Sequence, residues 1–283
     1  MKLGFHGATT MKADLATDIK VSAAAGFKGL ELEDGKINQY LADHSLTDLR
    51  NLFKQHAIEP TSINTLEFIG FRQDYAQLQA ECRQLSQIAE AIGCTLLVTI
   101  PSPTPRAYKG QPELNYPWDD LIKEYVGVLQ DLSGITERYN VRLAFEFLGF
   151  GWCSVRTPRS AYEIVQKTAR ENVGMNFDTC HFYAGGGLLS ELDDVDATRI
   201  FTFHLNDLED VPKEAITDAV RVMPGWGVIP LGEVCSKLKQ IGYNGICSVE
   251  LFRPEYWDWD PLENAKKSYE TAVKVLSPYF SLE

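Results

Sequence analysis

The segment Val173-Gly-Met-Asn-Phe-Asp-Thr-Cys-His181 begins as an apolar, β-prone run and ends in an acid that is followed three residues later by a histidine. Strands that are buried on both faces of a parallel sheet read as nearly continuous apolar runs. In barrels built from such strands, the chemistry lies at the C-terminal ends of the strands. The segment therefore predicts a buried parallel strand that carries polar side chains into a functional site.

Three further apolar runs end in a group that can bind a metal ion. Arg142-Leu-Ala-Phe-Glu146 and Ile246-Cys-Ser-Val-Glu250 each end in a carboxylate, and Ile200-Phe-Thr-Phe-His204 ends in an imidazole. Together with the acid of the first segment they form a set of three carboxylates and one histidine, which suits Mn²⁺, Co²⁺ or Zn²⁺. We therefore predict a site for one divalent metal ion, with these ligands at the ends of four neighbouring strands: Glu146, Asp178, His204 and Glu250.

Predicted strands and helices alternate along the whole chain. The strands are expected at 3–8, 29–33, 61–66, 95–100, 142–147, 173–178, 200–206 and 245–251. The helices are expected at 12–25, 45–56, 74–92, 118–139, 158–170, 231–241 and 262–275, with a short helix after the glycine run 185–187.

Such alternation indicates parallel strands that are joined by crossover helices. Eight units favour the α/β fold of a closed (β/α)8 TIM barrel over an open doubly wound sheet. A chain of 283 residues can form such a barrel as one domain, so we assign residues 1–283 to a single domain. Residues 101–116 contain four prolines and are predicted to form a loop at the catalytic rim.

The composition argues against several classes of partner. A formal net charge of -12 repels phosphate backbones, so we expect no nucleic acid partner and favour a small polyhydroxy substrate. No apolar run approaches the length of about 18 residues that spans a membrane, and the N-terminus lacks the apolar core of a signal peptide. We therefore expect no membrane contact and a cytoplasmic location.

The six cysteines show no Cys-x-x-Cys spacing, which is typical of reduced, buried thiols.

The metal-ligand motifs resemble those of a known superfamily. Ala144-Phe-Glu146, Asn176–His181, Phe203-His204, Arg221–Gly227 and Ser248–Phe252 are similar to the xylose isomerase-like TIM barrels, a superfamily of sugar isomerases and epimerases. Three further stretches are most similar to its inosose isomerase branch, which belongs to myo-inositol catabolism: Phe5–Thr10, Tyr40–Ser45 and Ser248–Tyr256. The likeness covers essentially the whole chain.

The resemblance implies a role for each motif residue. Glu146, Asp178, His204 and Glu250 would bind the metal, and Glu146 and Glu250 would also be the catalytic acid and base. His181 and Arg221 would bind substrate oxygens. The implied reaction is a metal-dependent isomerisation of a cyclic keto-polyol, 2-keto-myo-inositol to 1-keto-D-chiro-inositol, by proton transfer through an enediolate.

Several alternatives remain open. Another keto-sugar isomerase or epimerase, such as one acting on hydroxypyruvate, and a dehydratase of inosose or 3-dehydroshikimate would use the same metal site. A non-catalytic polyol-binding protein is disfavoured by the intact acid pair, and an abasic-site endonuclease by the five histidines and the negative charge. Glu31 and Asn64 are candidates for substrate contacts or for packing, and His6 is left unassigned. The oligomeric state is not determined, so a homo-oligomer remains open.

Overall fold

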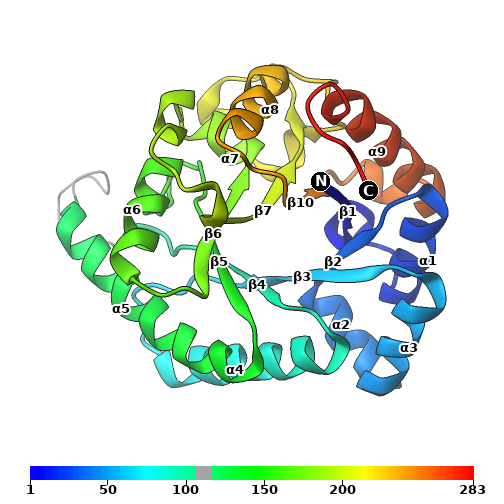
Figure 1. Cartoon of the computed structure of the whole chain (residues 1–283), viewed down its shortest axis with the longest axis horizontal. Helices are drawn as coiled ribbons and strands as arrows, with labels where there is room; N and C mark the ends of the chain where they lie inside the picture. The colour runs from blue at the N-terminus through cyan, green and yellow to red at the C-terminus, as the bar shows by residue number, and fades with distance from the viewer. Residues whose placement is uncertain (106–115) are drawn as a thin grey trace.

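The computed structural model describes residues 1–105 and 116–283 of the chain, and its eight parallel strands close into a barrel. Figure 1 looks along this barrel, with the helices arranged around the strands. The strands neighbour one another in the order β1-β10-β7-β6-β5-β4-β3-β2, so the first and last strands of the barrel pair and close it. The predicted (β/α)8 TIM barrel is confirmed. The assignment of residues 1–283 to one domain stays a prediction.

The barrel strands have these bounds: β1 Lys2–His6, β2 Gly29–Glu33, β3 Glu59–Leu66, β4 Leu96–Thr99, β5 Arg142–Glu146, β6 Val173–Asp178, β7 Ile200–Leu205 and β10 Ile246–Val249. The α-helices are α1 Leu15–Ala25, α2 Asp34–Leu41, α3 Leu46–His56, α4 Tyr75–Ile92, α5 Trp118–Thr136, α6 Pro158–Thr168, α7 Thr179–Ala184, α8 Leu231–Gln240 and α9 Pro261–Leu276. A small antiparallel pair outside the barrel consists of β8 Asp207–Leu208 and β9 Arg221–Val222. Short 3-10 helices are η1 Gly7–Thr10, η3 Glu137–Tyr139, η4 Leu189–Leu192, η5 Ala197–Arg199, η6 Lys213–Ala215, η7 Asp218–Val220 and η8 Tyr256–Asp258.

Strand β6 shows how the residue alternation separates the core from the site. Successive side chains of a strand point to opposite faces of the sheet. Val173, Met175 and Phe177 belong to the main hydrophobic core, which packs the helices onto the barrel. Asn176 and Asp178 occupy the alternate positions, and both are fully buried although they are polar. The apolar residues thus attach the strand to the helices, while the polar ones face the barrel interior at its C-terminal end.

The helix boundaries follow local signals that the sequence contains. Helix α1 ends at Gly26, whose φ of 108° is favourable for glycine, and α4 ends in the same way at Gly93. Thr157 caps α6 and is followed by a proline in the first turn. The predicted ends of α1 and α4 and the predicted start of α6 are confirmed. These boundaries set the lengths of the helical connections between successive parallel strands.

Three elements differ from the sequence-based prediction. Helix α2 was not expected because it begins directly where β2 ends and contains Gly35, a poor helix former. Helix α7 starts at the residue after β6, before the glycine run, whereas the short helix expected after that run is η4. The β8–β9 pair is too short to produce a periodic pattern. Within the predicted loop 101–116, residues 106–115 lie outside the described residues.

Within residues 1–105 and 116–283, no helix combines the length and the apolar character that crossing a bilayer requires. All six cysteines are buried free thiols, as the spacing predicts.

Candidate metal centre

Four side chains from neighbouring strand ends meet inside the mouth of the barrel. Glu146 ends β5, Asp178 ends β6, His204 lies in β7, and Glu250 directly follows β10. One potential ligand atom of each lies within 4.8 Å of the others, and all four residues are buried. The residues that the sequence predicts as ligands are therefore adjacent in space, although 104 positions separate the first from the last. Their role as metal ligands stays a prediction.

The centre contains more buried negative charge than its neighbours neutralise. Nδ1 of His204 lies 3.2 Å from Oε2 of Glu250, 3.4 Å from Oε1 of Glu146 and 3.9 Å from Oδ2 of Asp178. Burial alone would lower the pKa of His204, but the surrounding carboxylates raise the pKa well above its usual value. Carboxylates gathered in a low-dielectric interior favour the binding of a cation between them.

One carboxylate oxygen of the centre has no hydrogen-bond partner among the described residues. Oε1 of Glu146 is buried and has no hydrogen bond, and burial raises the pKa of this carboxyl group. A buried carboxylate oxygen without a hydrogen bond is costly unless a cation or a donor approaches it. Three carboxylates and one imidazole are the mixed oxygen and nitrogen donors that Zn²⁺, Mn²⁺ and Co²⁺ accept. The residues present thus fit a divalent ion.

Asp178 combines a structural role with its place in the centre. Its Oδ1 accepts a hydrogen bond of 2.7 Å from the backbone N–H of His181, which caps α7. Its Oδ2 accepts hydrogen bonds from Asn206 at 2.8 Å and from Arg221 at 3.0 Å. The cap places His181 in the first turn of the helix, next to the carboxylates. A strand-end acid can therefore be a helix cap and a member of the cluster at once.

Arg221 is the permanent cation of the centre. It is 1% exposed, and its Nη1 lies 2.6 Å from Oε2 of Glu250. Its Nη2 lies 3.2 Å from Nε2 of His181 and 2.7 Å from the carboxylate of Asp218. Burial raises the pKa of Glu250, but His204 and Arg221 outweigh it and hold the pKa well below its usual value. Glu146 and Glu250 therefore lie in opposite electrostatic environments.

These side chains open into a cavity of about 220 Å³, which lies at the C-terminal end of the strands. Its walls include both predicted catalytic acids, both predicted substrate ligands and an asparagine from β3: Glu146, Glu250, His181, Arg221 and Asn64. His204, Asp178 and Glu31 are not among its lining residues. The two acids are thus accessible to a small molecule, whereas His204 and Asp178 lie behind them.

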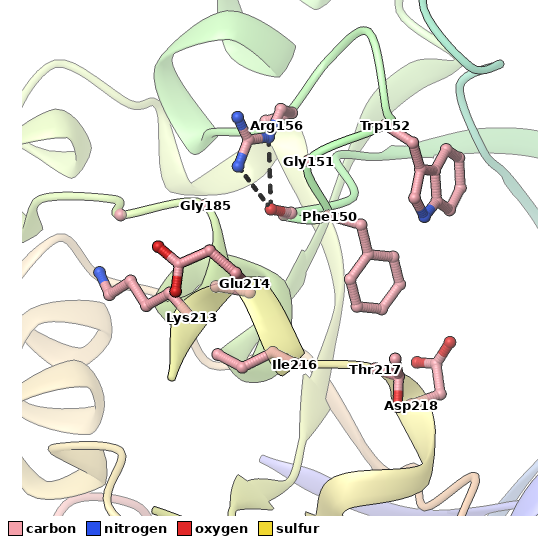
Figure 2. Close-up of a pocket in the computed structure, with 13 residues that line it drawn as sticks. Phe150, Gly151, Trp152, Arg156, Gly185, Lys213, Glu214, Ile216, Thr217 and Asp218 are labelled. Carbon is pink, nitrogen blue, oxygen red and sulfur yellow. Dashed lines mark hydrogen bonds between the residues drawn. The ribbon is translucent and has the colours of Figure 1, made fainter. Parts of the chain in front are cut away.

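A larger cavity of about 680 Å³ adjoins this one, and the two share Phe150, Trp152 and Asp218 as walls. Figure 2 shows the Phe150 ring between Trp152 and Asp218. Phe150 stacks on Trp152 with ring centroids 5.7 Å apart, and it forms a T-shaped contact with the His181 ring at a centroid distance of 4.9 Å. These rings separate the inner cavity from the outer one, and their apolar faces suit the C–H surface of a polyol.

The carboxylate of Asp207 binds the loop that follows Arg221. Its Oδ2 accepts hydrogen bonds from the backbone N–H groups of Gly225 and Gly227, and its Oδ1 accepts one from Ile229. Gly225 has a φ of +82°, and a Cβ at Gly227 would lie 2.0 Å from the Leu208 carbonyl oxygen. Glycine is therefore favoured at position 225 and required at position 227. Asp207 is a site-forming residue that the sequence pattern does not reveal.

The Gly227→Ala substitution is expected to lower the free energy of unfolding by about 1–3 kcal/mol, because the added methyl group collides with backbone. Urea unfolding followed by circular dichroism measures this change. Gly151→Ala is the matched control, since a Cβ there meets no atom within 4 Å, and its effect should stay within about 0.5 kcal/mol. Equal stability of the two variants would contradict the close approach at Gly227.

Several polar residues of the centre are absent from the predicted set. Asn176 places Nδ2 2.9 Å from Nδ1 of His204, and Asn206 holds Asp178 as described above. Both lie two residues from a predicted ligand, so the period of a strand puts them on the same face, and this signal was available in the sequence. Asn64 lines the cavity, as a substrate contact would require, whereas Glu31 contacts His204 instead.

Comparisons with known proteins agree with this geometry. Residues 19–279 match the family model for the xylose isomerase-like TIM barrel. Inosose isomerases of Bacillus velezensis and Bacillus subtilis are each 37% identical, over 100% of this chain and 100% of the relative. A crystal structure of the IolI protein with a zinc atom has a TM-score of 0.93 at 37% identity, over 99% of this chain and 100% of that chain. The chain therefore belongs to the xylose isomerase-like TIM barrel family, together with the inosose isomerases.

Proposed function

We propose that the protein is a divalent-metal-dependent isomerase that converts 2-keto-myo-inositol to 1-keto-D-chiro-inositol. The observation that carries this proposal is the buried cluster of three carboxylates and one histidine beside a cavity of about 220 Å³. Two of its acids reach that cavity, as the transfer of a proton on a bound substrate requires. The names of the full-length inosose isomerase relatives support the choice of substrate.

Glu146, Asp178, His204 and Glu250 would hold the ion. The zinc atom of the similar IolI structure supports zinc, and the donor set also suits Mn²⁺ and Co²⁺. When bound, a divalent ion polarises the ketone oxygen and so makes the hydrogen on the adjacent carbon more acidic. The chain's own residues then have to bind the substrate, move that proton and stabilise the charge that develops on oxygen.

The two acids are suited to the proton transfer. One of Glu146 and Glu250 takes the proton from the hydroxyl-bearing carbon, which leaves an enediolate. The other donates a proton to the former carbonyl carbon, while the neighbouring hydroxyl oxygen gives its own proton to the former carbonyl oxygen, so that the first becomes the new carbonyl and the second a hydroxyl. No atom is gained or lost in this exchange. Arg221, which is always charged, would stabilise the enediolate oxygens, and His181 would orient a substrate oxygen by hydrogen bonding.

Incubation of the zinc-loaded protein with 2-keto-myo-inositol in D₂O tests the reaction class. We expect NMR to show 1-keto-D-chiro-inositol, with deuterium at the exchanged carbon and an unchanged molecular composition. A dehydratase would instead release water and form an unsaturated product that absorbs in the ultraviolet. A binding protein would leave the substrate chemically unchanged and undeuterated. Either of these two outcomes would overturn the proposed isomerase.

The cellular location of the protein and the kind of molecule it binds are also part of the proposal. We place the protein in the cytoplasm, which the six free thiols support because oxidising compartments favour disulfides. A small polyhydroxy ketone is the proposed partner rather than nucleic acid, which the net charge of -12 supports.

A further inference from the structure

Glu31 lies on the far side of the His204 ring from the predicted metal ligands. Its two carboxylate oxygens lie 3.1 and 3.0 Å from Nε2 of His204, and both residues are fully buried. Glu31 comes from β2 and His204 from β7, and β1 and β10 stand between those strands in the barrel. The contact therefore spans the barrel interior rather than joining neighbouring strands.

The contact determines which nitrogen of His204 keeps its proton when the other nitrogen binds an ion. Both carboxylate oxygens of Glu31 lie within hydrogen-bonding distance of Nε2 of His204. Carboxylate oxygens accept hydrogen bonds, so the geometry makes Nε2 the donor in this contact. Nδ1, the other ring nitrogen, is the one that faces Glu146, Asp178 and Glu250. A neutral ring in this arrangement presents the lone pair of Nδ1 to the centre.

His6 supports the same arrangement from β1. Its Nδ1 accepts a 2.9 Å hydrogen bond from the backbone N–H of Ala8, so a neutral ring carries its proton on Nε2. This buried Nε2 lies 3.3 Å from Oε1 of Glu250 and 3.7 Å from Oε1 of Glu31, and it has no hydrogen-bond partner among the described residues. The donor thus points between a predicted ligand and the carboxylate behind His204.

We propose that Glu31 is a positioning residue that keeps the proton of His204 on Nε2, so that Nδ1 is directed at the ion, with His6 as a second support. The proposal rests on the metal centre of the proposed function. Carboxylates that accept the free N–H of a metal-bound histidine fix its tautomer and orientation, and their loss typically costs about 10–100-fold in metal affinity. The first two strands would then supply no ligand but would orient ligands that come from the last four.

Two other roles for Glu31 fit the structure less well. Glu31 is not among the residues that line the cavity of about 220 Å³, so it is not placed to contact a substrate there. Nor does Glu31 belong to the group of four whose ligand atoms converge, since its oxygens lie beside Nε2 rather than Nδ1. A substrate contact would change KM and leave metal affinity unaltered, which distinguishes the two roles experimentally.

Zn²⁺ titration of metal-free full-length protein, with a chromophoric chelator as competitor, tests the proposal. We expect Glu31→Ala to weaken zinc binding about 10–100-fold and Glu31→Gln to weaken it less, because an amide oxygen still accepts the N–H. Asp18→Asn is the matched control: Asp18 is as buried, but its side chain bonds Thr10 and Lys36. This control should retain the wild-type zinc affinity even if its melting temperature falls.

Nitrogen NMR of the histidine side chains in the zinc-loaded wild-type protein gives a readout that needs no variant. We expect Nε2 of His204 to carry a proton and Nδ1 to show the shift of a metal-bound nitrogen. Zinc on Nε2, or Glu31 variants with wild-type affinity, would overturn the positioning role while leaving the proposed function intact. Failure of the wild-type protein to bind zinc would overturn the metal centre itself and the positioning role with it.

Discussion

The Glu250→Gln substitution is expected to lower kcat for the keto-polyol isomerisation by about 100- to 10,000-fold, the usual contribution of a positioned acid or base. Glutamine keeps the size of the side chain and can still offer an oxygen to the ion, but its amide cannot accept the substrate proton. It also removes the negative charge that lies 2.6 Å from Nη1 of Arg221. Steady-state kinetics at saturating Zn²⁺, with the zinc content measured in parallel, separate lost chemistry from lost metal.

Glu255→Gln is the matched control for this experiment. Glu255 follows the same strand end, but its side chain is 67% exposed and pairs with Arg253 at the surface. Its removal should leave kcat within about twofold of wild type, since exposed ion pairs contribute about 0–1 kcal/mol even to stability. A Glu250→Gln variant with full zinc content and near-normal kcat would exclude Glu250 as the acid or base.

Removal of the divalent ion should abolish turnover. Without the ion, no divalent charge polarises the ketone, and that polarisation contributes several kcal/mol to lowering the barrier. Treatment with a chelator followed by gel filtration should therefore leave only background conversion, and added Zn²⁺, Mn²⁺ or Co²⁺ should restore it. Full activity in protein shown to be free of metal would refute the metal-dependent reaction.

Removal of the divalent ion should also lower the free energy of unfolding. A ligand that binds only the folded state stabilises it by about 2.7 kcal/mol when the free ion is 100-fold above its Kd. At a given Zn²⁺ concentration the effect should be larger than for a surface site, because relief of the repulsion among the buried carboxylates Glu146, Asp178 and Glu250 lowers the Kd. Thermal unfolding with and without Zn²⁺ measures it. An unchanged melting temperature would argue that these acids hold no ion.

Much of the fold could be predicted from local patterns. The sequence predicts a strand at 173–178 with the bounds that β6 has, because a barrel strand needs apolar residues on the outer face that packs against the helices. Gly26 and Gly93 end helices where the chain must adopt a positive φ, which glycine does at no steric cost. The β8–β9 pair left no such pattern, since its conformation depends on Asp207 and on contacts between residues far apart in the sequence.

The residues of the candidate site also divide into those that the sequence pattern indicates and those that it does not. Glu146, Asp178, His204 and Glu250 could be nominated because each ends an apolar run, and parallel closure brings equivalent strand ends together. Arg221 could be named only by resemblance: nothing in its own segment shows that it is buried against Asp178 and Glu250. Its burial follows from the folding of a long loop over the barrel mouth.

The sequence by itself determined the barrel, the chemical nature of the four converging groups and the order in which the strands present them. Tertiary structure alone decided the difference between Glu31 and Glu250, which both stand before a leucine at the end of a strand-forming run. Glu250 reaches the cavity, whereas Glu31 lies behind His204. The physical reason is that the residue pattern of a strand specifies only whether a side chain faces the helices or the barrel interior. Which side chain it meets across the interior depends on how the eight strands close into the barrel and on the residues that the other strands place there.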